Sequence, residues 1–430
     1  MPSIQKKYNQ FFHDVFALTG STTLAKLIGL ALVPVVTRLF SPDDFGVVAL
    51  MLAIVMVLGT ISALRYDQAI VIPDNDAEAN QLVRLSYSLV LMTGGVLFFV
   101  TFLLLSYFPD ISIVNSVGEW MYLIPLLVIL TGISEILSNW STRKTRYKLI
   151  GSSEMTVSLV VSGSRIASGF LHGSSVLGLI AGNVLGLVAK ILILLKARNA
   201  HENTQLNLQN PPGLLETASK YREFPLFSAP TGILNSLFQK LPVIALGVMF
   251  LPGVVGLYAM AARMSRLPID IVALPIRRIY MQRIAKLRSS GQKIHGLLFK
   301  TVVGLLLLGI LPFSLIAFFG ESLFAFVLGE KWGVSGIYAS ILVPWLYSMF
   351  VVTPVSSNFV VLKKQALWFR IQLYNGVLGL SVFVAGYLFG MMVVDILKLF
   401  SILGMCANLV VFFIAYIITA QADNEMYANK

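Results

Sequence analysis

Basic side chains interrupt the most apolar stretches of this sequence, and their chemistry needs an explanation first. Lys26, Lys240, Arg263 and Arg266 lie near the middle of long apolar runs. A cation at the centre of a bilayer costs about 2.5–3.5 kcal/mol on insertion scales. Such a residue is kept at that depth when it faces water or a polar protein interior. The pattern therefore predicts a membrane protein whose interior is positively charged and could bind an anion.

The best-defined group is Arg263, Arg266 and Asp270, which follow one another at spacings of three and four residues. On a helix this spacing places all three on one face, so that Arg266 can pair with Asp270. Arginine offers paired donors to phosphate or carboxylate oxygens. We expect Arg263 and Arg266 to contact an anion. The alternative is an ion pair between helices that only stabilises the bundle.

Further cations could line the same interior. Lys26 and Lys240 lie in the first helices of the two sequence halves, and we expect both to raise the potential of a central cavity. The alternative is that their side chains snorkel towards the headgroups. Arg165 lies moderately deep in another run and is a candidate for the same cavity. Arg65 ends a run beside Asp67, and it either pairs with that carboxylate or lines the cytoplasmic entrance.

Acidic residues are rare inside the apolar runs. Glu135 and Glu154 lie on consecutive runs near the basic loop 143–148, and we expect them to neutralise that loop. A role in proton coupling is the alternative. Lys190 lies close to the end of its run, and we expect it to snorkel or to be paired.

The composition leaves little room for a water-soluble fold. Hydrophobic residues make up 57% of the chain and charged residues 12%, whereas soluble domains carry about 25% charged residues. The net charge of +12 comes mainly from short loops, which is a pattern of membrane orientation, so we expect no nucleic-acid partner. A single cysteine, Cys406, excludes an internal disulfide framework. We find no nucleotide-binding loop, metalloprotease motif or catalytic triad, and we expect no cofactor, no metal and no enzymatic activity.

Runs of about 20 mostly apolar residues, the length that spans a bilayer, recur along the chain. Backbone polar groups in lipid must be satisfied within each span, so the runs are helices. We predict an all-α polytopic membrane protein with about 12 transmembrane helices. The predicted spans are 16–38, 44–66, 84–107, 118–140, 150–171, 174–196, 224–249, 253–276, 297–320, 335–361, 368–390 and 393–419.

The loops predict the orientation of these spans. If the N-terminus is cytoplasmic, Arg38 and Lys331 are the two loop cations on the outside, and the other loop cations are inside. An even number of spans places both termini in the cytoplasm. The segment 276–288 combines apolar residues at helical spacing with a basic face, and we expect it on the cytoplasmic surface near anionic lipid.

A polar connection divides the chain almost equally. We predict an N-terminal six-helix lobe (1–200), a cytoplasmic linker (201–222) and a C-terminal six-helix lobe (223–430). At an offset of 210 residues, Phe40, Pro42, Gly46 and Ala49 match Phe250, Pro252, Gly256 and Ala259. Six is an even number, so the lobes have the same orientation and are pseudo-symmetric about an axis along the membrane normal, around a central cavity.

Three stretches resemble one known family. These are T-R-L-F-S-P-D-D-F-G at 37–46, L-R-Y-D-Q-A-I-V-I-P at 64–73 followed by Asp74, Asp76 and Glu78, and V-G-L-Y-A-M-A-A-R at 255–263. They are similar to the polysaccharide or O-antigen flippase (Wzx-type) family of the multidrug/oligosaccharidyl-lipid/polysaccharide exporter superfamily. The predicted length, spans and repeat agree with that family.

The resemblance implies a function, a location and partners. It implies a multi-pass protein of the bacterial inner membrane that moves undecaprenyl-pyrophosphate-linked oligosaccharide units to the periplasmic leaflet by alternating access. The product would feed O-antigen (lipopolysaccharide), capsule or another surface polysaccharide. The implied partners are the lipid-linked oligosaccharide and membrane lipids, and a polysaccharide polymerase and a chain-length regulator are further candidates.

Other transporters of the same superfamily are the main alternative. A multidrug exporter is expected to have an acidic residue in its first span, where this chain has Lys26. A lipid II flippase usually has two further spans, for which this chain has no room. A scaffold without transport activity would have no reason to keep cations at the centre of its spans.

Overall fold

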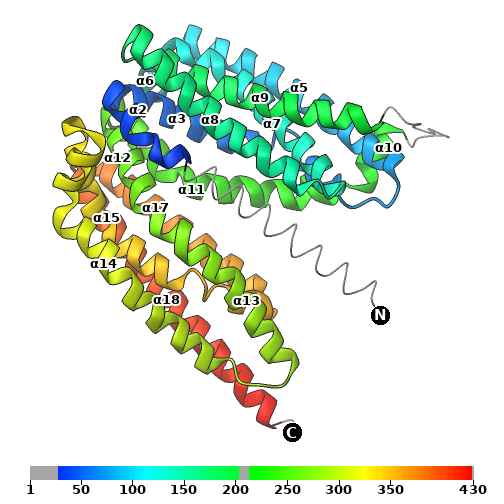
Figure 1. Cartoon of the computed structure of the whole chain (residues 1–430), viewed down its shortest axis with the longest axis vertical. Helices are drawn as coiled ribbons and strands as arrows, with labels where there is room; N and C mark the ends of the chain where they lie inside the picture. Colours follow the sequence, from blue (N-terminus) through cyan, green and yellow to red (C-terminus); the bar gives the residue numbers. More distant parts are fainter. Residues whose placement is uncertain (1–27, 203–212, 429–430) are drawn as a thin grey trace. The chain divides into compact units, whose positions relative to one another are not determined.

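The computed structural model describes residues 28–202 and 213–428, and these residues are almost entirely helical, without a strand (Figure 1). Within them, 9 helical segments are long and apolar enough to cross a membrane. The prediction of an all-α, multi-pass membrane protein is therefore confirmed. These segments are Pro42–Gly59, Asp76–Tyr107, Ser112–Arg143, Val176–Arg198, Phe224–Met249, His295–Leu328, Glu330–Val361, Gln365–Leu388 and Val393–Asn424.

The other three predicted spans contain helices that are shorter or less apolar. The first predicted span, 16–38, begins outside the described residues and ends in α2 (Val33–Leu39). The fifth is α8 (Tyr147–His172), whose serines and charged residues lower its hydropathy. The eighth begins as α12 (Pro252–Ser265), which is short because the helix changes its hydrogen-bonding pattern near Pro268.

Contacts divide the chain into two compact units, Met1–Gly256 and Leu257–Lys430. The remaining helices of the first unit are α3 (Pro42–Gly59), α4 (Tyr66–Ala69), α5 (Asp76–Tyr107), α6 (Ser112–Val117), α7 (Leu123–Arg143), α9 (Val176–Glu202), α10 (Leu214–Lys220) and α11 (Ala229–Met249). The predicted second lobe begins at residue 223, yet α11 packs against α3 and α6 within the first unit. A helix can belong to one sequence repeat and pack with the other, so the lobe limits remain a prediction.

The core of the first unit forms around α4, α5 and α7. Trp140 and Ile136 on α7 pack with Leu82 on α5 and with Tyr66 and Ile70 at the two ends of α4. All five side chains are buried. Helix α4 has four residues and is too short to span a membrane. The apolar cluster holds it between the longer helices α5 and α7.

The second unit is built mainly from long helices that pack on one another. It continues with α13 (Leu274–Ser289), α14 (His295–Leu328), α15 (Gly333–Val352), α16 (Ser357–Val361), α17 (Gln365–Leu388) and α18 (Val393–Ala428). Helix α15 packs between α14 and α18, and α17 packs on α18. Phe313 of α14 meets Phe350 of α15 at a ring-centroid distance of 5.6 Å, and both rings are buried.

Three predicted spans are interrupted where the sequence predicts continuous helices. The prediction for 44–66 is wrong at its C-terminal end, because α3 ends at Gly59 and Leu64 and Arg65 have positive φ angles of 47° and 65°. The span 253–276 changes into a π-helix (Ile269–Ala273) after Pro268, which has no N–H to donate to the preceding turn. The span 335–361 breaks between α15 and α16.

Candidate functional site

Arg263 and Arg266 lie on the exposed side of α12 and its C-terminal turn, in the second unit. Tyr258, Ala261 and Ser265 are among the buried positions of the same segment. Arg266 Nε lies 3.6 Å from Asp270 Oδ1, and Asp270 is half-buried. The predicted spacing thus brings these two groups together, although Asp270 belongs to the π-helix. Among the described residues, Arg263 forms no ion pair. Within the described residues, Arg266 is thus paired with a carboxylate, whereas Arg263 on the adjacent turn is not.

In the first unit, Arg65 lies at the break between α3 and α4 and faces α11. A Cβ atom built on Gly232 of α11 would lie 2.5 Å from Arg65 Nη2 and 2.8 Å from Nε. The guanidinium therefore rests directly on the helix backbone, at a position where any residue other than glycine would displace it. Arg65 Nε is buried and has no hydrogen-bond partner in the described part of the chain. A buried guanidinium N–H without an acceptor leaves a donor that an anion could satisfy.

Lys240 follows Arg65 along the same seam between helices. Gly232, Ser236 and Lys240 are spaced four residues apart and run along one side of α11. Ser236 Oγ lies 2.7 Å from Thr60 Oγ1, a hydrogen bond between α11 and the C-terminal end of α3. Lys240 is half-buried. The spacing along α11 therefore places Lys240 on the side of this helix that carries Gly232, about two helical turns from the contact with Arg65.

Asp67 provides the negative charge near Arg65, but it does so as a buried group. Its carboxylate accepts a hydrogen bond of 3.2 Å from Asn139 Nδ2 on α7, and its exposed fraction is 9%. The pKa of Asp67 is raised to about 6, chiefly by burial; the charge of Arg65 opposes this rise, and the charge of Glu135 adds to it. Arg65 therefore acts on Asp67 through its charge and not through a direct contact. This weakens the first alternative for Arg65, a local pair with Asp67.

Arg165 has a partner on a neighbouring helix instead of joining these groups. Arg165 lies on α8 and donates from Nη2 to Asn183 Oδ1 on α9 over 3.2 Å. A Cβ on Gly182 would lie 3.0 Å from Arg165 Cγ, so the side chain fills the α8–α9 interface. Lys26 lies outside the described residues.

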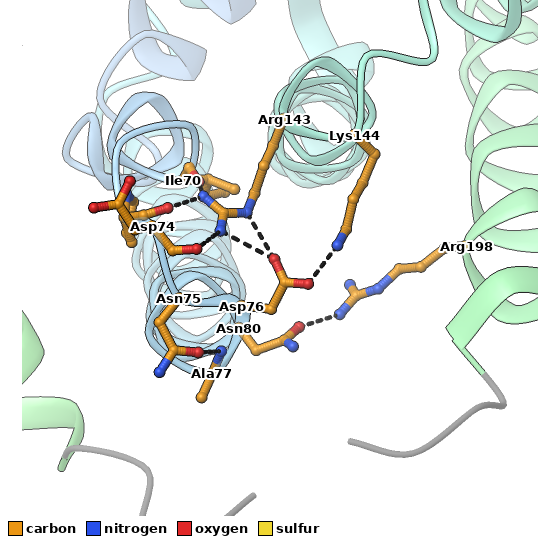
Figure 2. A network of polar contacts seen from close by, with 10 residues as sticks. Ile70, Asp74, Asn75, Asp76, Ala77, Asn80, Arg143, Lys144 and Arg198 are labelled. Atoms are coloured by element: carbon orange, nitrogen blue, oxygen red, sulfur yellow. Dashed lines mark hydrogen bonds and ion pairs between the residues drawn. The ribbon is translucent and has the colours of Figure 1, made fainter. Parts of the chain in front are cut away.

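A second polar network, at the start of α5, was missed by the sequence reasoning (Figure 2). Arg143 Nε and Nη2 lie 3.1 Å and 3.0 Å from Asp76 Oδ1, and Lys144 binds the other oxygen of the same carboxylate. Arg143 also donates to the backbone carbonyls of Ile70 and Asp74. The carboxylate thereby ties the basic loop after α7 to the turn before α5.

The same helix start also holds the segment that follows residues 203–212. Glu78 binds Lys220 at the end of α10, and it accepts a hydrogen bond of 3.0 Å from Tyr221 Oη. Tyr66 Oη donates to the carbonyl of Ala218 over 2.9 Å. The acidic residues Asp76 and Glu78 of the sequence motif therefore clamp two basic segments of the first unit.

The expected role of Glu135 and Glu154 is corrected by these contacts. Arg143 and Lys144 of the basic loop 143–148 pair with Asp76, whereas Glu154 Oε1 binds Lys190 Nζ at 2.7 Å. Lys190 is thus paired, one of the two outcomes expected for it. Glu135 acts on Asp67, through the charge effect described above. The signal that could have identified Asp76 is its place directly before a long apolar helix, where carboxylates also favour the helix N-terminus.

Comparison with solved structures shows which fold this is. A multidrug resistance MATE family transporter of the MOP superfamily, in an inward-facing conformation, matches with a TM-score of 0.69 and 15% identity over 94% of this chain and 96% of that chain. The lipid II flippase MurJ, in an inward closed conformation, matches with a TM-score of 0.65 and 12% identity over 96% and 91%. At these identities the likeness establishes the fold.

Sequence comparison places the chain in a family. No curated protein matches the sequence significantly. The sequence profile of the family described as "Polysaccharide biosynthesis protein" matches residues 35–336, which is well over half of the chain. The matched range includes Arg65, the acidic residues Asp76 and Glu78, and both Arg263 and Arg266. The chain therefore belongs to the polysaccharide biosynthesis protein family.

Proposed function

We propose that this protein is a flippase for undecaprenyl-pyrophosphate-linked oligosaccharide units. It moves them across the bacterial inner membrane by alternating access, with both termini in the cytoplasm, for the synthesis of O-antigen, capsule or another surface polysaccharide. Membership of a polysaccharide biosynthesis family and a fold shared with a lipid II flippase support this function. A polymerase and a chain-length regulator remain candidate partners.

The observation that carries the proposal is that Arg263 is exposed and forms no ion pair with a described residue. Asp270, in contrast, tethers the neighbouring Arg266. The diphosphate of the cargo cannot enter hydrocarbon unaided, whereas the polyprenyl chain can stay in lipid. A guanidinium binds two phosphate oxygens at once, so an untethered arginine beside an oriented one suits a diphosphate.

Arg65 and Lys240 are the corresponding candidates in the first unit. Arg65 brings an unsatisfied donor to the seam with α11, and Lys240 adds a second positive charge to that seam. Lys26 and Arg165 are retained as candidates from their depth in the sequence, although Arg165 already has Asn183 as a partner. The expectation that all these cations face one pathway stays a prediction.

Export of a small molecule is the second candidate function. The fold shared with a multidrug resistance transporter favours it. However, drugs exported as organic cations would meet like charges at Arg263, Arg266 and Lys240. This candidate therefore requires a neutral or anionic molecule.

The test measures translocation of a fluorescent undecaprenyl-pyrophosphate oligosaccharide in proteoliposomes. Two lost contacts of about 1.5 kcal/mol each should slow translocation by Arg263→Gln plus Arg266→Gln about 100-fold. The matched control, Lys363→Gln plus Lys364→Gln, removes the same charge from two exposed residues before α17 and should transport normally. Equal transport by all three proteins would reduce the arginines to a structural role. No transport of any glycan by the wild type would overturn the flippase itself.

A further inference from the structure

Helix α13 (Leu274–Ser289) leaves a basic, partly apolar surface that the transport function does not use. It carries Arg277, Arg278, Arg283, Lys286 and Arg288 and no acidic residue. The sequence has no Asp or Glu between Asp270 and Glu321, whereas Lys293 and Lys300 extend the positive charge beyond the helix. We propose that this face of α13 is a docking surface for anionic phospholipid headgroups.

The buried side of α13 is fixed to its own unit, so the opposite side has a defined direction. Tyr280 and Ile284, one turn apart, are the buried residues of the helix. Tyr280 Oη donates to Asn358 Oδ1 of α16 over 2.9 Å, and Asn358 Nδ2 donates to Thr419 Oγ1 of α18 over 2.7 Å. Helix α13 is therefore anchored through a buried polar chain to α18.

Its C-terminal end is anchored as well. Arg288 Nη1 donates to the carbonyl of Ala422 over 3.0 Å. The buried Asp423 accepts from the backbone N–H groups of Ile294 and His295 at 3.1 Å and 3.0 Å, which fixes the turn that follows α13. Because its middle and its C-terminal end are held, α13 presents a fixed surface rather than a loose basic tail.

The exposed side has the composition of a helix that lies in a membrane interface. Ile279, Arg283 and Lys286 follow one another at spacings of four and three, so they form one stripe. Ile279 is 59% exposed and Met281 is 39% exposed, beside exposed Arg283 and Lys286. Apolar side chains among cations bind best where headgroups meet acyl chains, because both kinds of group find a partner there.

The first unit shows what a basic segment looks like when the protein neutralises it internally. Arg143 and Lys144 share Asp76, and Lys220 binds Glu78 (Figure 2 shows the Asp76 pair). In contrast, Arg283 and Lys286 form no ion pair within the described residues. Asp423 is occupied by backbone donors. No described carboxylate neutralises Arg283 and Lys286, and an anionic leaflet would supply their counter-charges.

The test places a spin label on the proposed surface. The full-length protein carries Cys406→Ser, which removes its one native cysteine, and Ile279→Cys for labelling. It is reconstituted in vesicles of phosphatidylcholine alone or of phosphatidylcholine with phosphatidylglycerol. Accessibility to oxygen and to a water-soluble relaxation agent then reports whether position 279 lies in lipid or in water. Both leaflets of such vesicles contain phosphatidylglycerol, so the readout depends neither on orientation nor on cargo.

We expect the label to be shielded from water in the mixed vesicles and more exposed in phosphatidylcholine alone. Each basic residue near an anionic surface contributes about a fivefold factor to binding, so Arg283→Gln plus Lys286→Gln should weaken lipid contact about 25-fold and expose the label. Lys363→Gln plus Lys364→Gln, with the same charge change, should leave it shielded. A label equally exposed to water in both compositions, or released equally by the control, would overturn the proposal without bearing on transport.

Discussion

The backbones of α3 and α12 are in direct contact at Gly46 and Gly256, within the first unit. A Cβ atom on Gly46 would overlap the carbonyl oxygen of Pro252, and one on Gly256 would overlap the carbonyl oxygen of Pro42. The four residues are equivalent in pairs at the sequence offset of 210. The contact is therefore reciprocal, and each repeat supplies the glycine that admits the backbone of the other. Substitution at either position forces the two helices apart, because a backbone carbonyl cannot move aside.

Gly46→Ala and Gly256→Ala should each destabilise the protein by about 1–3 kcal/mol, the usual cost of overpacking. Thermal unfolding in detergent measures the effect. Gly95→Ala in α5 is the matched control, since a Cβ there meets nothing within 4 Å. In the control, alanine should be neutral or stabilising by up to about 1 kcal/mol, because it favours the helix. Equal stability of all three variants would contradict the close approach.

Asp67→Asn should stabilise the protein at neutral pH. The pKa of Asp67 is raised from its ordinary value of 3.8 to about 6 by burial. A raised carboxyl pKa means that the folded state holds its proton more tightly than the unfolded state does. The contribution of Asp67 to the free energy of unfolding is therefore largest at a pH below its pKa in the unfolded state. It falls as the pH rises through its pKa in the folded state, and it is constant at higher pH. At neutral pH the cost is on the order of 3 kcal/mol.

The measurement is the melting temperature of wild type and Asp67→Asn across this pH range. Asparagine can still accept from Asn139, so the variant keeps the hydrogen bond without the charge. Its advantage should be largest above about pH 6 and should shrink towards about pH 4. Asp74→Asn, at an exposed position in the next turn, should show no such trend. A pH-independent difference between Asp67→Asn and wild type would contradict the buried ionisation.

Asp76→Asn should loosen the contact between the basic loop and the start of α5. Arg143 has a side-chain exposure of 10%, so it would keep a nearly buried charge without its carboxylate. Loss of this charge-assisted pair should cost about 1–3 kcal/mol. A double-mutant cycle with Arg143→Gln separates the pair from the other contacts of Arg143, since the coupling disappears if the two residues do not interact. If the effects of the two substitutions are additive, Arg143 stabilises the protein through its hydrogen bonds to backbone carbonyls and not through Asp76.

The helical segments could be predicted from the sequence because hydropathy over about 20 residues is a local property. The spacing of Arg266 and Asp270 likewise anticipated their approach, because residues four apart on a helix are neighbours. The break at 60–65 could not be predicted, because Leu64 and Arg65 adopt positive φ angles that their residue types do not favour.

The partners of charged residues were harder to predict than the helices. The basic loop was assigned to Glu135 and Glu154, which are near it in sequence, yet it binds Asp76, which is 67 residues before Arg143. Such a pairing depends on how α5 and α7 pack, and one sequence holds no signal for that packing. The seam between Arg65 and α11 was missed for the same reason, because it joins segments more than 160 residues apart.

Gly232→Ala tests whether that seam serves transport. The added methyl group would meet Arg65 Nη2 and Nε and also Thr60 Cγ2, which are all side-chain atoms, so the fold should persist while the guanidinium is displaced. If Arg65 contacts the cargo, translocation should fall about tenfold, the equivalent of one charge-assisted hydrogen bond. Gly163→Ala in α8, where a Cβ meets nothing within 4 Å, is the matched control. Arg65→Lys on the Gly232→Ala background shortens and narrows the cationic group, so partial recovery would show that position, rather than packing, limits transport. Normal translocation by a folded Gly232→Ala protein would remove Arg65 from the proposed site.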